Sequence, residues 1–202
     1  LKKISVTFKP SNFTSFLNNK IKKGQLTTEL KIYLDNDNLL ENFTASGSVK
    51  NLKAEILKDI YIEKTNFDFF TDKTDILLKN ISSEGGSFKI LDGDLKIDIS
   101  KEISLRSNFK TKLKLNKQSK KYIDLIEDFK YKKNIIGFEA DLNNSLIVNF
   151  DNTYKVKNFN FKNNGEISKF TLDFKDPLNN YFLNEEIKQL SLTNSQIETS
   201  FN

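Results

Sequence analysis

The chain has 202 residues, a modest net charge of +5, and neither cysteine nor histidine. It therefore lacks a disulfide framework, a thiolate metal site and most of the nucleophile–base pairs that enzymes use. Arg106 is the only arginine among 32 basic residues, which argues against nucleic acid as a partner because arginine makes most bidentate contacts to bases and phosphates. We expect a protein that is not an enzyme and needs no cofactor.

Apolar and polar residues alternate along most of the chain, which is typical of strands with one apolar face. A first strand is predicted at 4–9, and the stretch 13–17 also suits a helical turn. The next strands are predicted at 26–35, 43–57, 59–71, 75–82, 87–91, 94–100 and 103–115. The alternation changes parity at Asn51, which predicts a β-bulge. SSEGGS at 82–87 and LDGD at 91–94 are typical of hairpin turns.

The segment DNDNLLE at 35–41 brings Asp35, Asp37 and Glu41 together. It resembles the start of a calcium loop, but it lacks the glycine and the spacing to a bidentate glutamate that such loops have. We therefore predict a polar hairpin turn.

The segment SKKYIDLIEDFKYK departs from strand periodicity. Tyr122, Leu125, Ile126 and Phe129 recur at helical spacing, which predicts an amphipathic helix over 120–130. Its apolar stripe suits either a plug that packs on the sheet, which is the interpretation we favour, or an element that touches a membrane. Further strands are predicted at 135–142, 145–150, 154–162, 166–175 and 187–192, with a last one at 196–201.

The apolar faces of these strands need a cover. About a dozen strands with roughly three inward side chains each place on the order of thirty-five apolar groups on one face, more than a short helix can shield. We predict a mainly β fold in which a long curved antiparallel sheet either forms an open groove around an apolar guest or closes as a sandwich. The sequence reads as a single elongated β domain over 1–202, and a subdivision, if there is one, falls near 116–134. Because methionine is absent, we interpret the chain as a segment of a longer protein.

The region 26–174 resembles the AsmA-like family of bacterial envelope proteins, the YhdP and TamB type. The likeness consists of three short motifs in a row. The first contains a glycine, an apolar residue, an asparagine and a leucine. The second is a strand with asparagine and phenylalanine, and the third is a short apolar strand that begins with glycine. The residues that carry the likeness are Gly47, Val49, Asn51 and Leu52, then Asn66, Phe67 and Phe69, then Gly93, Leu95 and Ile97.

The resemblance implies a segment of a repeating β-groove protein that conducts phospholipid between the inner and outer membranes and binds acyl chains. It also implies a periplasmic location, with a tether to the inner membrane in a region outside this segment. The alternative is a self-contained periplasmic or extracellular β-sandwich that acts as a binding or assembly module. The residues expected to line a groove are Leu52, Ala54, Ile56, Ile60, Ile62, Phe67, Phe69, Leu95, Ile97, Val148, Phe159, Phe161, Phe170, Leu172 and Phe174.

Overall fold

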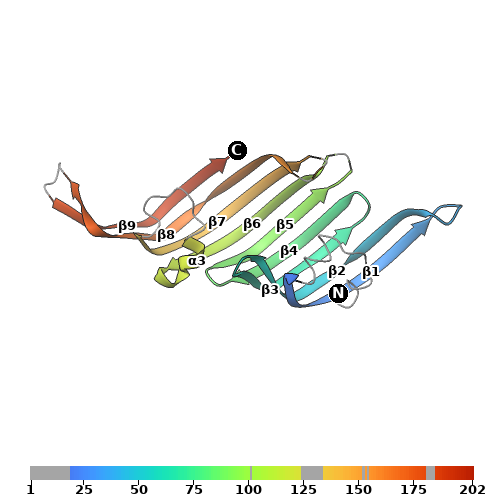
Figure 1. Cartoon of the computed structure of the whole chain (residues 1–202), viewed down its shortest axis with the longest axis horizontal. Helices are drawn as coiled ribbons and strands as arrows, with labels where there is room; N and C mark the ends of the chain where they lie inside the picture. Colours follow the sequence, from blue (N-terminus) through green and yellow to red (C-terminus); the bar gives the residue numbers. More distant parts are fainter. Residues whose placement is uncertain (1–18, 101, 124–133, 152, 154, 181–184) are drawn as a thin grey trace.

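Nine strands in the described part of the chain form one antiparallel sheet. This computed structural model describes residues 19–100, 102–123, 134–151, 153, 155–180 and 185–202. Each strand pairs with its neighbours in sequence, so the sheet order is β1-β2-β3-β4-β5-β6-β7-β8-β9. Figure 1 shows the strands side by side along the long axis of the molecule. The chain therefore folds as a continuous meander that leaves β1 and β9 at the two edges.

The strands are long for a globular protein, where five or six residues are usual. Their bounds are β1 Ile21–Leu34, β2 Leu40–Leu57, β3 Ile60–Thr71, β4 Asp75–Gly85, β5 Phe88–Asp98, β6 Ser104–Asn116, β7 Ile135–Phe150, β8 Val156–Asn180 and β9 Glu185–Phe201. A 3-10 turn at Lys117–Ser119 leads into the short helix α3, Lys120–Ile123.

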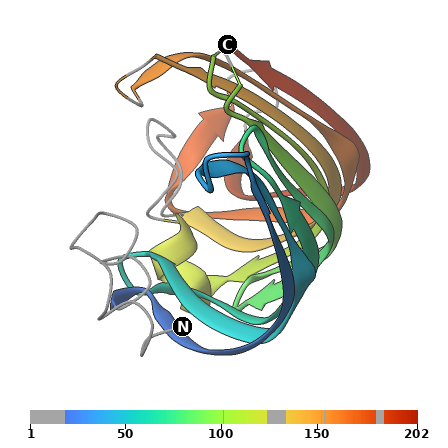
Figure 2. The ribbon, with the colours of Figure 1, turned by 90° about the vertical axis from the view of Figure 1, so that its right-hand side faces the viewer.

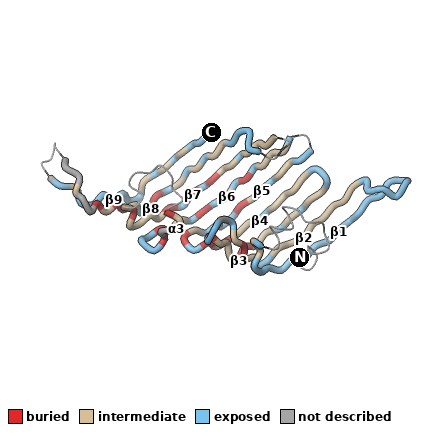
Figure 3. The backbone as a smooth tube through the Cα atoms, in the orientation of Figure 1, coloured by how far each residue is buried: buried red, intermediate tan, exposed pale blue. Residues whose placement is uncertain are grey.

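The sheet is curved, and α3 lies inside the curve (Figure 2). The described strands form a single open sheet rather than two packed layers. The prediction of a mainly β fold with a long curved antiparallel sheet is confirmed, and of the two forms left open the described strands adopt the open one. Buried residues concentrate in the middle strands, whereas β1 is exposed along nearly its whole length (Figure 3).

The predicted number of strands is wrong, because four predicted breaks fall inside continuous strands. LDGD lies within β5, where Asp92 pairs with Lys110 beside a bulge. The breaks expected near 143–144, 163–165 and 193–195 lie within β7, β8 and β9. Asparagine suits turns, but here the amide of Asn143 donates to Asn164 across the ladder at 3.2 Å. A hydrogen bond between strands thus satisfies asparagine side chains that, in the sequence alone, indicated a turn.

The bulge predicted at Asn51 is confirmed. Asn51 has a φ of 51°, and the β2–β3 register shifts between Val49 and Leu52. Lys64 and Asn80 have similar φ values, 48° and 55°, within the next two strands. Each bulge resets the parity of its strand, so the apolar residues before and after it point to the same face.

The predicted helix over 120–130 is described only as far as Ile123, and the rest of it lies outside the described residues. The predicted strand at 4–9 and the predicted helical turn at 13–17 also lie outside the described residues. β6 and β7 pair directly from Asn116 and Gly137 onward, so the segment between them is an insertion between two neighbouring strands of one sheet. The turns predicted at 35–41 and 82–87 are confirmed, because they join β1 to β2 and β4 to β5.

Four hairpin turns at one end of the sheet share an aspartate whose carboxylate caps the turn. These residues are Asp35, Asp72, Asp98 and Asp151. Oδ1 of Asp72 accepts hydrogen bonds from the N–H groups of Thr74 and Asp75 at 2.7 and 2.8 Å. These N–H groups hold the pKa of Asp72 below its usual range. At Asp98 and Asp151 the hydroxyl two positions further on lowers the pKa most, followed by backbone N–H groups.

These aspartates make stability depend on pH in the acid range. A lowered folded pKa adds stability that is complete above the unfolded pKa of about 3.9 and is lost as the pH falls through the folded value. The triple variant Asp72→Asn, Asp98→Asn and Asp151→Asn keeps an acceptor oxygen but does not titrate. We expect its melting temperature to fall less between pH 5 and pH 2.5 than that of the unmodified chain. Asp37→Asn, in a turn at the same end, is the control, and parallel curves for the triple variant and the unmodified chain would contradict the prediction.

Candidate functional site

One face of the sheet carries most of the apolar side chains of the strands. Directly paired residues of neighbouring strands point to the same side, so the register can be followed across the whole sheet. One row of such partners runs through all nine described strands: Thr28, Gly47, Phe69, Leu78, Leu95, Ser107, Leu146, Phe161 and Phe201. We call the face that contains this row the groove face.

The groove face is the concave face. The ring of Tyr122, on α3, meets the ring of Phe88, on β5, edge to face with centroids 6.2 Å apart. The next residue of the helix, Ile123, is buried against the strands on the same side. Because α3 lies inside the curve of the sheet, the side chains that it touches point inward (Figure 2).

Register places twelve of the fifteen residues expected to line a groove on this face, and alternation along the same strands places Ile56, Ile60 and Phe174 there as well. Phe67, for example, pairs with Val49, and Phe159 pairs with Val148. Their exposure differs widely: Leu172 is 4% exposed, whereas Phe159 is 43% exposed. The strand faces were therefore readable from the sequence, but the depth of burial was not.

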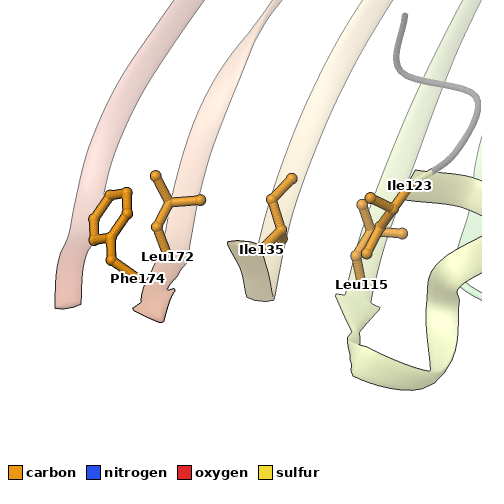
Figure 4. Packing of buried hydrophobic residues seen from close by; sticks show 5 residues of the cluster. All are labelled: Leu115, Ile123, Ile135, Leu172 and Phe174. Carbon is orange, nitrogen blue, oxygen red and sulfur yellow. The ribbon is translucent and has the colours of Figure 1, made fainter. Parts of the chain in front are cut away.

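A buried cluster closes the groove face near α3 (Figure 4). Leu115, Ile135 and Leu172 come from three successive strands, and their side chains lie in a row beside Phe174. Ile123 packs onto the β6 end of this row. The helix thus covers one corner of the groove face, as the plug interpretation expects for the part of the helix that is described.

A cavity of about 580 Å³ opens beside this cluster. Its lining is almost wholly apolar and comes from β2, β3, β5 to β9, α3 and the turn before β5. The lining residues are Ile56, Ile60, Ser87, Phe88, Leu113, Leu115, Tyr122, Ile135, Phe138, Ile167, Phe170, Leu192 and Ile197. Three of them, Ile56, Ile60 and Phe170, belong to the set expected from the sequence. Leu113 and Leu115 alternate in the same way and could have been found from this signal.

Small and polar residues interrupt the apolar side chains of the groove face, which sequence reasoning missed. Thr65 and Ser83 share a hydrogen bond of 2.7 Å between their hydroxyl groups. The amide of Asn144 donates to Thr111 at 3.0 Å. Three glycines on β2, β5 and β8 lie on the same face, where each pairs with a large apolar residue: Gly47 with Phe69, Gly93 with Phe109 and Gly165 with Leu142. The polar side chains satisfy one another, so they do not leave unpaired groups on an apolar surface.

The opposite, convex face carries the charges. Lysine and acidic residues form cross-strand ion pairs there, including Lys112 with Asp141 at 3.2 Å and Lys114 with Glu139 at 3.3 Å. Lys64 and then Lys89 donate to Glu84, which holds the pKa of its carboxyl below the usual range. The convex face is not wholly polar. Register places Phe70 and Ile147 on it, 40% and 38% exposed.

Around the cavity, the groove face offers a partner mainly apolar contact. Among the described residues of the cavity lining, Tyr122 is the only titratable one. No cluster of three or more acidic side chains suited to a metal ion occurs in the described ranges. Within the same ranges, no helix combines the length and the apolar character needed to cross a membrane.

Comparisons of the chain with protein-family models, curated proteins and solved structures found no match. The likeness to the AsmA-like family therefore stays a prediction from the sequence.

The close backbone approach at a groove-face glycine can be tested by adding a methyl group. At Gly165 a Cβ atom would overlap the carbonyl oxygen of Asp141 and lie 2.9 Å from the Cα of Leu142. Both are backbone atoms, so we expect Gly165→Ala to lower the free energy of unfolding by about 1–3 kcal/mol. At Gly137 the nearest atoms are side-chain atoms at 3.7 and 4.0 Å. Gly137→Ala is the matched control and should leave stability unchanged or raise it by up to about 1 kcal/mol. Equal losses in chemical denaturation would contradict the tight approach at Gly165.

The plug interpretation can be tested at Ile123, which is 6% exposed. Truncating a buried isoleucine to alanine typically costs about 2–5 kcal/mol. We therefore expect Ile123→Ala to lower the melting temperature clearly, whereas Lys117→Ala, in the exposed turn before the helix, should not. A membrane-touching element predicts the reverse result, an unchanged melting temperature with weaker binding to liposomes.

Proposed function

We propose that this chain is a segment of a bacterial envelope lipid-transfer protein and that its groove face holds phospholipid acyl chains on their way between the inner and outer membranes. One observation carries the proposal: the concave face carries apolar side chains on every described strand, and no second layer of described strands lies over it. A curved sheet of this kind surrounds a linear hydrocarbon chain on several sides while remaining open along its length.

Exposure supports a binding role for this face. On β1, Leu30 and Ile32 are 58% and 59% exposed, and on β9 Leu190 and Leu192 are 44% and 42% exposed. Register places all four on the groove face. Large contiguous apolar patches are uncommon on soluble monomers and mark binding surfaces where they occur. Burying these side chains against a guest would remove their contact with water.

The energetics favour an acyl chain as the guest. Exposing one methylene group to water costs about 0.8 kcal/mol, whereas moving it between two apolar surroundings costs almost nothing. The cavity, about 580 Å³, lies in the range of pockets that bind small molecules. The described residues of its lining include no lysine or arginine to pair with a phosphate, so the headgroup would stay in water at the open side of the groove.

The transport route and the location rest on the resemblance to the AsmA-like family. In that interpretation the segment lies in the periplasm, and other parts of a longer protein hold the inner membrane and reach the outer one. The alternative from the sequence, a sandwich-type binding module, assumes two packed layers, whereas the described strands form one sheet.

Photo-crosslinking at neighbouring positions tests the proposal. Leu192 lines the cavity and points to the groove face, whereas the register of Thr193 with Lys169 places it on the convex face. A crosslinking side chain at position 192 should capture phospholipid in cells and from liposomes, and one at position 193 should not. Both residues are exposed, so access of the probe to solvent does not explain a difference.

A second pair on the next strand controls for the sheet edge. Phe159 lies on the groove face, and the amide of Asn149 donates to the side chain of Asn158 on the convex face. We expect a lipid adduct at position 159 and none at 158. Adducts on both faces, or on neither, would contradict lipid binding by the groove.

A further inference from the structure

Among the described strands, β1 forms one edge of the sheet. It pairs with β2 on one side, and no other described strand lies on its outer side. Its residues from Lys22 to Leu34 are all exposed. Between Gln25 and Tyr33 the register with β2 runs without a bulge. A regular exposed edge strand is a template for another strand, because its outward N–H and C=O groups point at solvent.

Both edges carry irregularities, but they fall at different places along the strand. The β1–β2 register shifts only near the ends of β1, around Lys23 and at Leu34. β9 carries Asn194 in its middle with a φ of 51°, and its register with β8 also shifts between Asp173 and Leu178. Irregularities of this kind twist an edge away from further pairing. The regular stretch of β1 is therefore the better site for adding a strand.

We propose that β1 pairs with β1 of a second copy of this chain, antiparallel and centred on Leu30. Around the two-fold axis, Leu30 then faces Leu30 of the second copy, and Glu29 faces Lys31 of that copy. Because the axis is perpendicular to the sheet, the concave faces of both copies stay on the same side, and the two groove faces join into one.

Charge selects this register among the alternatives. Glu29 and Lys31 both lie on the convex face, where they form an ion pair of 3.2 Å along their own strand and are 67% and 60% exposed. Centring the pair on Glu29 or on Lys31 would bring like charges face to face. Centring on Thr28 leaves both charges opposite neutral residues, and centring on Ile32 brings Glu29 opposite Asp35. Centring on Leu30 gives two cross-strand ion pairs, which stabilise sheet pairing.

The side chains on the groove face are also compatible with pairing centred on Leu30. Leu26 and Ile32 are 39% and 59% exposed. In the dimer Leu26 would face Leu34 of the second copy, and Ile32 would face Thr28. Strand addition thus supplies main-chain hydrogen bonds together with cover for apolar side chains, the combination by which sheets add strands. The inference uses only the edge and does not depend on lipid binding.

Charge exchange tests the dimer on the full chain. We expect the unmodified protein to sediment as a concentration-dependent dimer. Glu29→Lys and Lys31→Glu each replace two attractive pairs with two repulsive ones and should weaken the dimer at least about tenfold. The double variant Glu29→Lys with Lys31→Glu restores opposite charges across the axis and should recover the dimer. Glu198→Lys on β9 is the control and should leave the dimer unchanged, and circular dichroism checks that each variant folds.

Cysteine crosslinking gives a second readout, because the chain has no cysteine of its own. Directly opposed residues of antiparallel strands have Cα atoms about 4.5–5.5 Å apart, which suits a disulfide. Leu30→Cys should form a covalent dimer on oxidation, whereas Thr193→Cys on β9 should not. A monomer at every concentration, a dimer insensitive to both single charge variants, or crosslinking through position 193 instead of position 30 would each overturn the proposal.

Discussion

The structure depends on a sheet that keeps most of its apolar side chains on one face without a second layer of described strands to cover them. Most sheets resolve this by packing against helices or another sheet. Here α3 covers one corner of the groove face. Curvature of the sheet buries further apolar surface, because bending brings the side chains of neighbouring strands closer together on the concave side. The buried cluster of Leu115, Ile135 and Leu172 lies beside the helix.

Keeping one face apolar along strands of this length requires corrections to the alternation. A strand of 18 residues such as β2 would lose its parity at the first irregularity, and every side chain beyond it would change face. The bulges at Asn51, Lys64 and Asn80 prevent this, because each inserts one residue where the apolar pattern itself shifts by one. Lateral ion pairs on the convex face, such as Lys112 with Asp141, are compatible with the register that the apolar pattern sets.

The faces of the strands could be predicted from the sequence because alternation is a local property, visible in Phe170, Leu172 and Phe174 alone. The lengths of the strands could not, because Asn143 and Asn164 look like turn residues until their cross-strand hydrogen bond is known. The cavity also escaped prediction. It needs the register of seven strands and the position of Tyr122, none of which is a local property. The residues Thr65 and Ser83 read as ordinary polar interruptions until they are placed side by side.

Folding and binding compete for the same apolar side chains, and the sheet divides them by position. Leu172, near α3, is 4% exposed and is already used for packing, so it offers a guest little. Leu190 pairs directly with it one strand further on and is 44% exposed. A guest of the groove face can use only what folding has left uncovered, a broad strip that reaches both edges. In the proposed role this suits a chain that moves: each methylene group that leaves one apolar contact meets another, so no single position holds it tightly.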